Sequence, residues 1–311
     1  MKKISVIIPF LNEAANIPHL TSELNDFCKL HSAVQWEIIF VNDGSIDNSV
    51  ELLTQSSPDS FNGKVITLSK NYGSHAALRA GILNATGDLV SFIYADLQDP
   101  LQLLLDMYAK LQKENANIVW ATRSTVPAGM IDRNFSKGYA YLMKKFVNQD
   151  YPEKGFDIAL FDKKVVDCLN QNIEANSSIF LQILTLGFTQ TTIYYEKQQR
   201  KAGKSKWTLS KKVKLLVDSF ISFSYFPIRI VTIIGFLMFL TGISYSLYLI
   251  YRKLIIGDLT PGWAITGTIL MLGFGVTNIS LGIIAEYLWR TLDASRKRPV
   301  FIIKDIIEIN R

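Results

Sequence analysis

The stretch FIYADLQDP, residues 92–100, ends an apolar run with a cluster of polar side chains. The run VSFI (90–93) predicts a buried β-strand, and Pro100 ends the strand region because proline cannot donate to a strand ladder. Asp96 and Gln98 follow the strand directly. A carboxylate and an amide two residues apart, on one side of an extended segment, can offer oxygen ligands to a hard divalent cation such as Mg²⁺ or Mn²⁺.

Similar apolar runs precede this one and predict an α/β fold. Each run is nearly continuous, as expected for strands that helices cover on both faces. Helical segments separate the runs, and this alternation predicts a mostly parallel sheet. The predicted strands are ISVIIPF (4–10), EIIFVND (37–43), KVITLS (64–69) and LVSFIYA (89–95), and the predicted helices include 14–30 and 74–85.

The carboxyl ends of these strands carry polar and charged side chains. Ligands of parallel sheets bind at these ends, so we expect the side chains to lie together. A preference of glycine and small polar residues for turns explains the glycines at these strand ends, but it does not explain why charged residues recur at all four. The strand ends supply Glu13, Asp43, Gly44, Ser45, Lys70, Asn71, Asp96 and Gln98.

This row of residues suits a nucleotide. The Asp43 carboxylate can bind ribose hydroxyls or a base edge, and Gly44 lets a ligand approach the backbone. A nucleotide diphosphate would add ligands to a cation at Asp96 and Gln98, which would neutralise charge on a departing diphosphate. The chain has neither GxGxxG nor a Walker A lysine motif, which disfavours a dinucleotide fold and a P-loop ATPase.

The last third of the 311-residue chain is strongly apolar. No residue is charged between Arg229 and Arg252 or between Asp258 and Glu286, and each gap exceeds the roughly 20 residues that span a bilayer. We therefore predict two transmembrane helices, with a buried helix hairpin of a soluble protein as the alternative. Basic residues concentrate outside the pair of spans, and no signal peptide precedes the first strand. This bias predicts a multi-pass protein of the cytoplasmic membrane with both termini in the cytoplasm.

Two segments border the predicted spans. WTLSKKVKLLVDSFISFSYFP (207–227) has apolar residues at helical spacing and a basic face, which favours a helix at the lipid headgroups over one packed on the preceding α/β domain. RPVFIIKD (298–305), after the second span, has strand character and is expected to rejoin the sheet.

Composition excludes other classes of protein. The net charge is +6, but many basic residues lie beside the predicted spans, where anionic lipid headgroups account for them. No nucleic-acid-binding motif is present, so nucleic acid is not an expected partner. Cys28 and Cys168 lack metal-site spacing, fit a reducing compartment and are expected to have no chemical role.

Four motifs together resemble the family-two glycosyltransferases of GT-A fold: SVIIPFLNEAANI, IIFVNDGSIDNS, LSKNYGSHAALRAGI and ADLQDP. The chain is most similar to the polyisoprenyl-phosphate glycosyltransferases, the group of bactoprenol glucosyltransferase and dolichyl-phosphate mannose synthase. The resemblance continues through RKAGKSKW, both predicted spans, AEYLWR and RPVFIIKD. It implies inverting, metal-dependent transfer of a sugar from a nucleotide-diphosphate sugar, with UDP as the default, to undecaprenyl phosphate.

The resemblance also assigns roles to individual residues and to parts of the chain. It implies a GT-A catalytic domain at 1–206, an interface segment at 207–227, a transmembrane hairpin at 228–290 and a cytoplasmic segment at 291–311. A monomer and a homo-oligomer both stay open. Asp96 and Gln98 match the metal ligands, and Asp157 matches an acidic residue near the reacting centre. The nucleotide-sugar positions are Pro9, Leu11, Glu13, Asp43, Ser45, Lys70, Asn71 and Asp96, and the acceptor-phosphate positions are Arg123, Arg133, Ser136, Arg200, Ser205 and Lys206.

Two departures from the family pattern concern the donor pocket. Relatives usually have an aspartate where Tyr94 stands and often an arginine where Ala159 stands. Tyr94 cannot supply a carboxylate to a metal or its water, which keeps open a catalytically inactive relative that binds nucleotide sugar or a partner. A processive polysaccharide synthase is disfavoured, because EKQQRKAG lacks the tryptophan of a QxxRW motif.

Overall fold

The computed structural model describes residues 2–56, 58–124, 130–152, 155–156, 158–172, 177–198, 218, 223–224, 226–256, 262–296 and 299–309, with only the helical backbone for 130–137. The chain divides into two compact units. The first comprises Met1–Leu216 with Pro299–Arg311, and the second Val217–Arg298.

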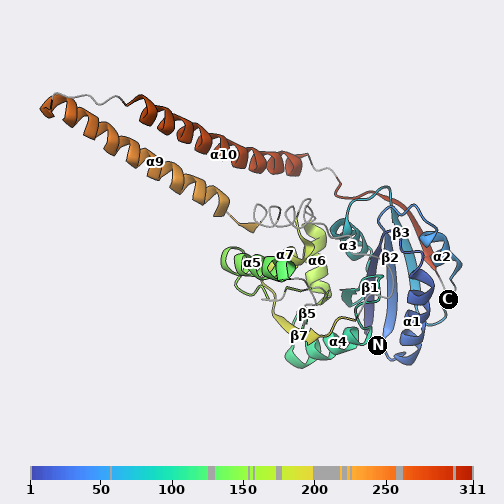
Figure 1. Ribbon diagram of the computed structural model, residues 1–311. Coiled ribbons are helices and arrows are strands. Elements are labelled where there is room, and N and C mark those ends of the chain that lie inside the picture. The colour runs from blue at the N-terminus through green and yellow to red at the C-terminus, as the bar shows by residue number, and fades with distance from the viewer. Residues whose placement is uncertain are drawn as a thin grey trace. The chain divides into compact units, whose positions relative to one another are not determined.

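The first unit is an α/β domain built on one mixed sheet (Figure 1). The strand order is β7-β5-β6-β4-β1-β2-β3-β8. Four of the seven pairings between described strands are parallel, and three are antiparallel. The strands are β1 (Lys3–Phe10), β2 (Gln35–Asn42), β3 (Asn62–Leu68), β4 (Leu89–Phe92), β5 (Ile118–Arg123), β6 (Ile158–Asp162), β7 (Gln190–Tyr195) and β8 (Ile303–Ile309).

Helices cover both faces of the sheet (Figure 1). Helices α1, α2 and α4 contribute to a core on one face, while α3 packs on β1 and β2 from the other and contacts α6 and α7. The helices of this unit are α1 (Ile17–Leu30), α2 (Ser49–Gln55), α3 (Ser74–Leu83), α4 (Gln102–Glu114), α5 (Met130–Phe146), α6 (Lys163–Gln171) and α7 (Ile179–Thr185).

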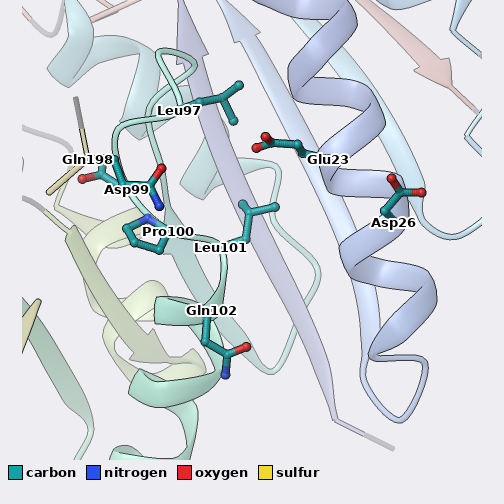
Figure 2. Close-up of a pocket in the computed structure, with 8 residues that line it drawn as sticks. All are labelled: Glu23, Asp26, Leu97, Asp99, Pro100, Leu101, Gln102 and Gln198. Carbon is teal, nitrogen blue, oxygen red and sulfur yellow. The ribbon is translucent and has the colours of Figure 1, made fainter. Parts of the chain in front are cut away.

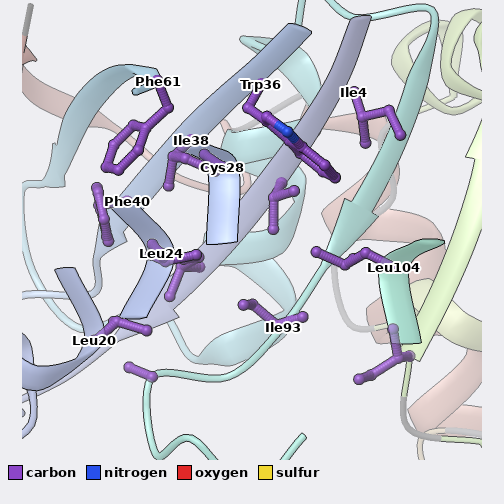
Figure 3. Packing of buried hydrophobic residues seen from close by; sticks show 14 of the residues in the cluster. Ile4, Leu20, Leu24, Cys28, Trp36, Ile38, Phe40, Phe61, Ile93 and Leu104 are labelled. Carbon is purple, nitrogen blue, oxygen red and sulfur yellow. The ribbon is translucent and has the colours of Figure 1, made fainter. Parts of the chain in front are cut away.

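The core explains why the strands read as unbroken apolar runs. Leu20, Leu24 and Cys28 of α1 lie against Ile38 and Phe40 of β2 (Figure 3). Alternate residues of the same strands meet the opposite helix layer. A Cβ on Gly81 of α3, for example, would lie 2.3 Å from Ile7 Cγ2. Both faces of the central strands are therefore buried, as predicted for this class of sheet.

The predicted strands are present, with two differences. β4 ends at Phe92, three residues before the predicted end, because residues 94–97 form a turn between the strand and α4. The antiparallel strand β6 lies between β4 and β5, an arrangement that the apolar runs did not indicate. Residues 303–309, as β8, pair antiparallel with β3 at one edge of the sheet.

The second unit contains α9 (Phe226–Tyr251), a π-helical turn (Arg252–Ile256) and α10 (Trp263–Ser295). Helices α9 and α10 contact each other. Two stretches, Ile228–Tyr251 and Leu272–Trp289, are long and apolar enough to cross a membrane, and neither is buried within the protein. Most of the predicted interface segment 207–227 lies outside the described residues.

Candidate functional site

The loops after β1 and β2 bind each other through side-chain to backbone hydrogen bonds. Ser45 Oγ accepts from the N–H of Asn12 at 2.9 Å, and Asn12 Oδ1 accepts from the N–H of Ile46 at 2.9 Å. Asn12 adopts φ 50°, a left-handed conformation that asparagine tolerates better than most residues. Pro9 is the second-last residue of β1, whereas Leu11 and Ser45 lie in the loops themselves, and the structure brings these loops together at the carboxyl edge of the sheet.

Asp43 joins the end of β2 to the loop after β3. Its buried carboxylate accepts from the N–H groups of Tyr72, at 2.7 Å, and Gly73, at 3.0 Å. Burial raises the pKa of the Asp43 carboxyl above its usual value, although the two backbone donors act in the opposite direction. A carboxylate has about four lone-pair sites, so these two bonds are compatible with the predicted contact to a nucleotide.

Gly44 allows these loops to approach closely. Its φ is +77°, and a Cβ there would lie 2.7 Å from both the amide nitrogen of Asn71 and the carbonyl carbon of Lys70. Any larger residue would therefore separate Asp43 from Lys70 and Asn71. The Lys70 ammonium lies 5.1 Å from the ring centroid of Tyr72, within the range of a cation–π contact.

Glu13 begins the connection from β1 to α1. Its N–H donates to Ser49 Oγ at 3.0 Å, and its carboxylate accepts from Asn16 Nδ2 at 2.7 Å. Glu13, Asp43, Ser45, Lys70 and Asn71 thus belong to adjoining loops at one edge of the sheet. Their predicted role in nucleotide-sugar binding stays a prediction.

The loop after β4 carries Asp96 and Gln98. The segment is a turn, so the expectation of an extended segment is wrong. Leu97 has φ 54°, and its buried side chain belongs to the core, which offsets the roughly 1 kcal/mol cost of a left-handed leucine. The backbone N–H of Gln98 donates to Asp96 Oδ1 at 3.4 Å, so the Asp96 carboxylate lies against the backbone of Gln98 within the turn.

The donor set at this loop fits a hard cation. A carboxylate and an amide oxygen are the oxygen ligands that Mg²⁺ and Mn²⁺ prefer. The Gln98 amide directs its nitrogen to the carbonyl of Gln198 at 3.3 Å, which makes its oxygen the atom suited to a cation. In the described part of the chain no group of three His, Cys, Asp or Glu residues could hold a metal. The phosphates of a bound donor could supply further ligands.

Several predicted site residues cannot be placed. Asp157, Arg200, Ser205 and Lys206 lie outside the described residues. Arg133 and Ser136 belong to α5, where the structure describes the backbone alone. Arg123 is the last residue of β5 and is half-buried. Their predicted roles, including phosphate binding, stay predictions.

The structure adds a buried arginine, Arg79, that the sequence reasoning did not single out. Arg79 is buried beneath α7, where its Nη2 donates to Ser177 Oγ and Gln182 Oε1, both at 2.8 Å. Burial and then the charge of Arg79 lower the pKa of His75 to about 4, so this imidazole is neutral at pH 7. A lone arginine within the apolar stretch HAALRAGIL was the available signal.

Sequence reasoning assigned no role to Asp99, Tyr195 or Lys197. Asp99 is buried, accepts from the hydroxyl of Tyr195 at 2.7 Å, and lies 3.4 Å from the ammonium of Lys197. The partners are almost a hundred residues apart in the chain. No local pattern could have revealed the pairing.

A pocket of about 350 Å³ lies beside the loop between β4 and α4 (Figure 2). Glu23 and Asp26 project from α1 on one side (Figure 2). The rest of the lining comes from Leu97, Asp99, Pro100, Leu101, Gln102 and Gln198. None of the predicted nucleotide-binding residues lines it. It is therefore distinct from the row of strand ends described above.

Comparison with known proteins identifies the relatives of this chain. Residues 5–169 match the model of glycosyl transferase family 2. The chain is 32% identical over 301 residues to the uncharacterized glycosyltransferase YkcC of Bacillus subtilis, covering 96% of this chain and 93% of that protein. It is 28% identical to the undecaprenyl-phosphate 4-deoxy-4-formamido-L-arabinose transferase of Salmonella choleraesuis, covering 99% and 94%.

Solved structures agree with the fold. Glucosyl-3-phosphoglycerate synthase from Mycobacterium tuberculosis, a GT-A transferase, superposes with a TM-score of 0.50 at 16% identity, covering 70% of this chain and 78% of that one. At this identity the likeness establishes the GT-A-like fold alone.

Proposed function

This chain belongs to glycosyl transferase family 2 and is a glycosyltransferase that uses a nucleotide sugar, and we propose that its acceptor is a polyisoprenyl phosphate at a membrane surface. The observation that carries the proposal is that one relative is similar along almost the whole chain. The relative named as an undecaprenyl-phosphate transferase aligns with 99% of the chain, including both apolar helices. A lipid-linked acceptor requires the enzyme to work at a membrane, which these helices would provide.

The catalytic domain would lie on the cytoplasmic side of the membrane. Lysines and arginines flank the pair of apolar helices, and the connection between the helices holds few charges. The positive-inside bias places such flanks in the cytoplasm. Nucleotide sugar and lipid phosphate would then meet at the inner membrane surface.

The acceptor explains why the chain needs no strong general base. A lipid monophosphate is already anionic at neutral pH, so its oxygen can attack the anomeric carbon directly. Direct displacement inverts the anomeric centre and gives a β-linked product from an α-linked donor. Catalysis then depends on positioning and on electrostatic stabilisation of the leaving diphosphate.

Each group of residues has a part in this scheme. Pro9, Leu11, Glu13, Asp43, Ser45, Lys70 and Asn71 would bind the nucleotide sugar, with UDP as the expected nucleotide. Asp96 and Gln98 would hold Mg²⁺ or Mn²⁺, which supplies charge neutralisation for the diphosphate when bound. Asp157 would orient the acceptor or stabilise positive charge on the sugar ring. Arginine guanidinium groups suit the acceptor phosphate, because they fork onto its oxygens. These are Arg123, Arg133 and Arg200, with Ser136, Ser205 and Lys206 beside them.

Transfer of label into lipid tests the proposal. The full-length protein in detergent is incubated with undecaprenyl phosphate, Mg²⁺ or Mn²⁺ and a panel of radiolabelled nucleotide sugars. We expect one donor to label the lipid phase, with loss of at least 100-fold in Asp96→Ala and on chelation. Asp106→Asn is the matched control, because Asp106 is an exposed carboxylate on α4 that accepts a hydrogen bond from Gln102.

Two outcomes would contradict the proposal. If transfer persisted in Asp96→Ala and in the presence of chelator, the reaction would not depend on a metal ion. A folded protein that binds nucleotide and transfers no donor to lipid would favour the inactive relative that Tyr94 keeps open.

A further inference from the structure

The loop that holds the candidate metal ligands is hydrogen-bonded to a segment almost a hundred residues later in the chain. Gln198 donates its N–H to the carbonyl of Gln98 at 2.8 Å, and the Gln98 amide donates back to the carbonyl of Gln198 at 3.3 Å. Both Asp99 and Gln198 line the same pocket (Figure 2). Gln98 therefore has its position set, in part, by Gln198.

Lys197 adds an ion pair between the same two segments. Its ammonium lies 3.4 Å from the carboxylate of Asp99, whose side chain is fully buried, while that of Lys197 is 11% exposed. Tyr195, the last residue of β7, donates its hydroxyl to the same oxygen of Asp99. A buried carboxylate is stable only with such partners, so Lys197 and Asp99 hold each other in place.

Tyr94 completes the environment of Lys197. The ammonium lies 5.9 Å from the centroid of the Tyr94 ring, within the range of a cation–π contact. A carboxylate at position 94 would offer the ammonium a second negative partner in competition with Asp99. The tyrosine instead offers its face and leaves Asp99 as the carboxylate bound to Lys197.

We propose that Lys197 is a positioning residue for the candidate metal ligands. By contacting both Tyr94 and Asp99, Lys197 would keep Asp96 and Gln98, which lie between them in the chain, arranged for a divalent cation. The inference rests on the proposed function, because it assumes that the loop after β4 takes the cation.

Binding of Mn²⁺, measured without turnover, tests this role. Free Mn²⁺ is followed by electron paramagnetic resonance during titration of the full-length protein in detergent, with UDP and without it. Partners that orient metal ligands typically contribute 10- to 100-fold to metal affinity, so we expect Lys197→Met to weaken Mn²⁺ binding about 10-fold. Lys197→Arg keeps the charge and should restore most of the affinity.

Variants of Tyr94 separate its ring from its hydroxyl. Tyr94→Phe keeps the ring and should bind Mn²⁺ as the unmodified protein does, whereas Tyr94→Leu should bind it about two- to fivefold more weakly. Lys163→Met is the matched control, because Lys163 forms an exposed ion pair with Asp167 on α6. Thermal unfolding of each variant separates a local effect from loss of the fold.

The outcomes distinguish this inference from the proposed function. Unchanged Mn²⁺ affinity in Lys197→Met and Tyr94→Leu, with normal binding by the unmodified protein, would overturn the role of Lys197 and leave the proposed function standing. Failure of the unmodified protein to bind Mn²⁺ even with UDP would overturn both.

Discussion

At the scale of single residues, Glu37 is a buried carboxylate near the start of β2 that has several partners away from the candidate site. It accepts hydrogen bonds from Ser5 and from the N–H and hydroxyl of Thr86, at 2.9 and 2.8 Å, and lies 3.2 Å from the Lys64 ammonium. Burial opposes ionisation, but these hydrogen bonds and Lys64 together lower the pKa of Glu37 from 4.5 to about 2. Glu37 therefore stabilises the fold as a carboxylate.

This shift predicts a pH dependence of stability. Because the pKa is lower in the folded state, the stabilisation is complete above the unfolded value of 4.5 and is lost as pH falls towards about 2. The shift corresponds to roughly 3 kcal/mol of unfolding free energy. We expect Glu37→Gln to lower stability at pH 7 by roughly 2–3 kcal/mol and to flatten the loss between these pH values. Denaturant unfolding across pH measures both effects, and equal acid sensitivity of the variant would contradict the assignment.

The exposed Glu51→Gln serves as the control, since its side chain lies at the surface of α2. It should change neither the stability at pH 7 nor the acid-dependent loss by more than about 0.5 kcal/mol.

Gly44 gives a second prediction at this scale. Gly44→Ala must accommodate φ +77° and a Cβ 2.7 Å from backbone atoms of Lys70 and Asn71. Gly187→Ala is a matched control, with φ +78° and no atom within 4 Å of its Cβ. We expect Gly187→Ala to cost about 1 kcal/mol and Gly44→Ala clearly more, with weaker UDP binding in Gly44→Ala alone. Calorimetric titration measures the affinity of each variant for UDP, and denaturant unfolding measures its stability. Equal effects of the two substitutions would show that the close approach of the loops is unimportant.

At the scale of elements, β8 completes the sheet at the edge next to β3. Ile309 is buried, at 4% exposure, and lies opposite Gly63, whose Cβ position would be 3.4 Å from that of Ile309. Ile306 in the same strand is 42% exposed. The strand follows the second apolar helix in the chain, so its pairing returns the end of the chain to the catalytic unit.

Substitutions along β8 should therefore differ sharply. Ile309→Ala removes a buried side chain and should cost roughly 2–4 kcal/mol of unfolding free energy. Ile306→Ala is the matched control and should cost less than about 1 kcal/mol. Denaturant unfolding followed by tryptophan fluorescence measures both, since Trp36 is buried in the same core. Equal costs would mean that β8 contributes backbone pairing and no packing.

Sequence reasoning found elements whose pattern is local and missed those that depend on distant partners. The runs that became β1, β2 and β3 are unbroken because helices cover both their faces, so composition alone revealed them. The antiparallel β6 carries no signal of its direction, because an apolar strand reads the same either way. Likewise Asp96 and Gln98 stand in a recognisable local motif, whereas Asp99 and Lys197 meet only after folding.

At the scale of the whole molecule, the arrangement of the apolar helices across a membrane is the property still to be tested. The helix connection contains Arg252 and Lys253, whereas a larger group of basic residues precedes the first helix and another follows the second. Positive charge is retained in the cytoplasm during insertion, which predicts a cytoplasmic catalytic domain and an external connection. Only this orientation gives the enzyme access to nucleotide sugars made in the cytoplasm.

Labelling of single cysteines tests this orientation. In a variant with Cys28 and Cys168 replaced by serine, Thr260→Cys in the connection should react in intact cells with a maleimide that cannot cross the membrane. Glu308→Cys, at an exposed position of β8, should react only after the membrane is opened, because β8 pairs with the catalytic domain. Labelling of Glu308→Cys in intact cells, with Thr260→Cys protected, would reverse the orientation. Labelling of neither until the membrane is opened would instead mean that the helices lie on one side, and the enzyme would then have to reach the proposed lipid acceptor from the membrane surface alone.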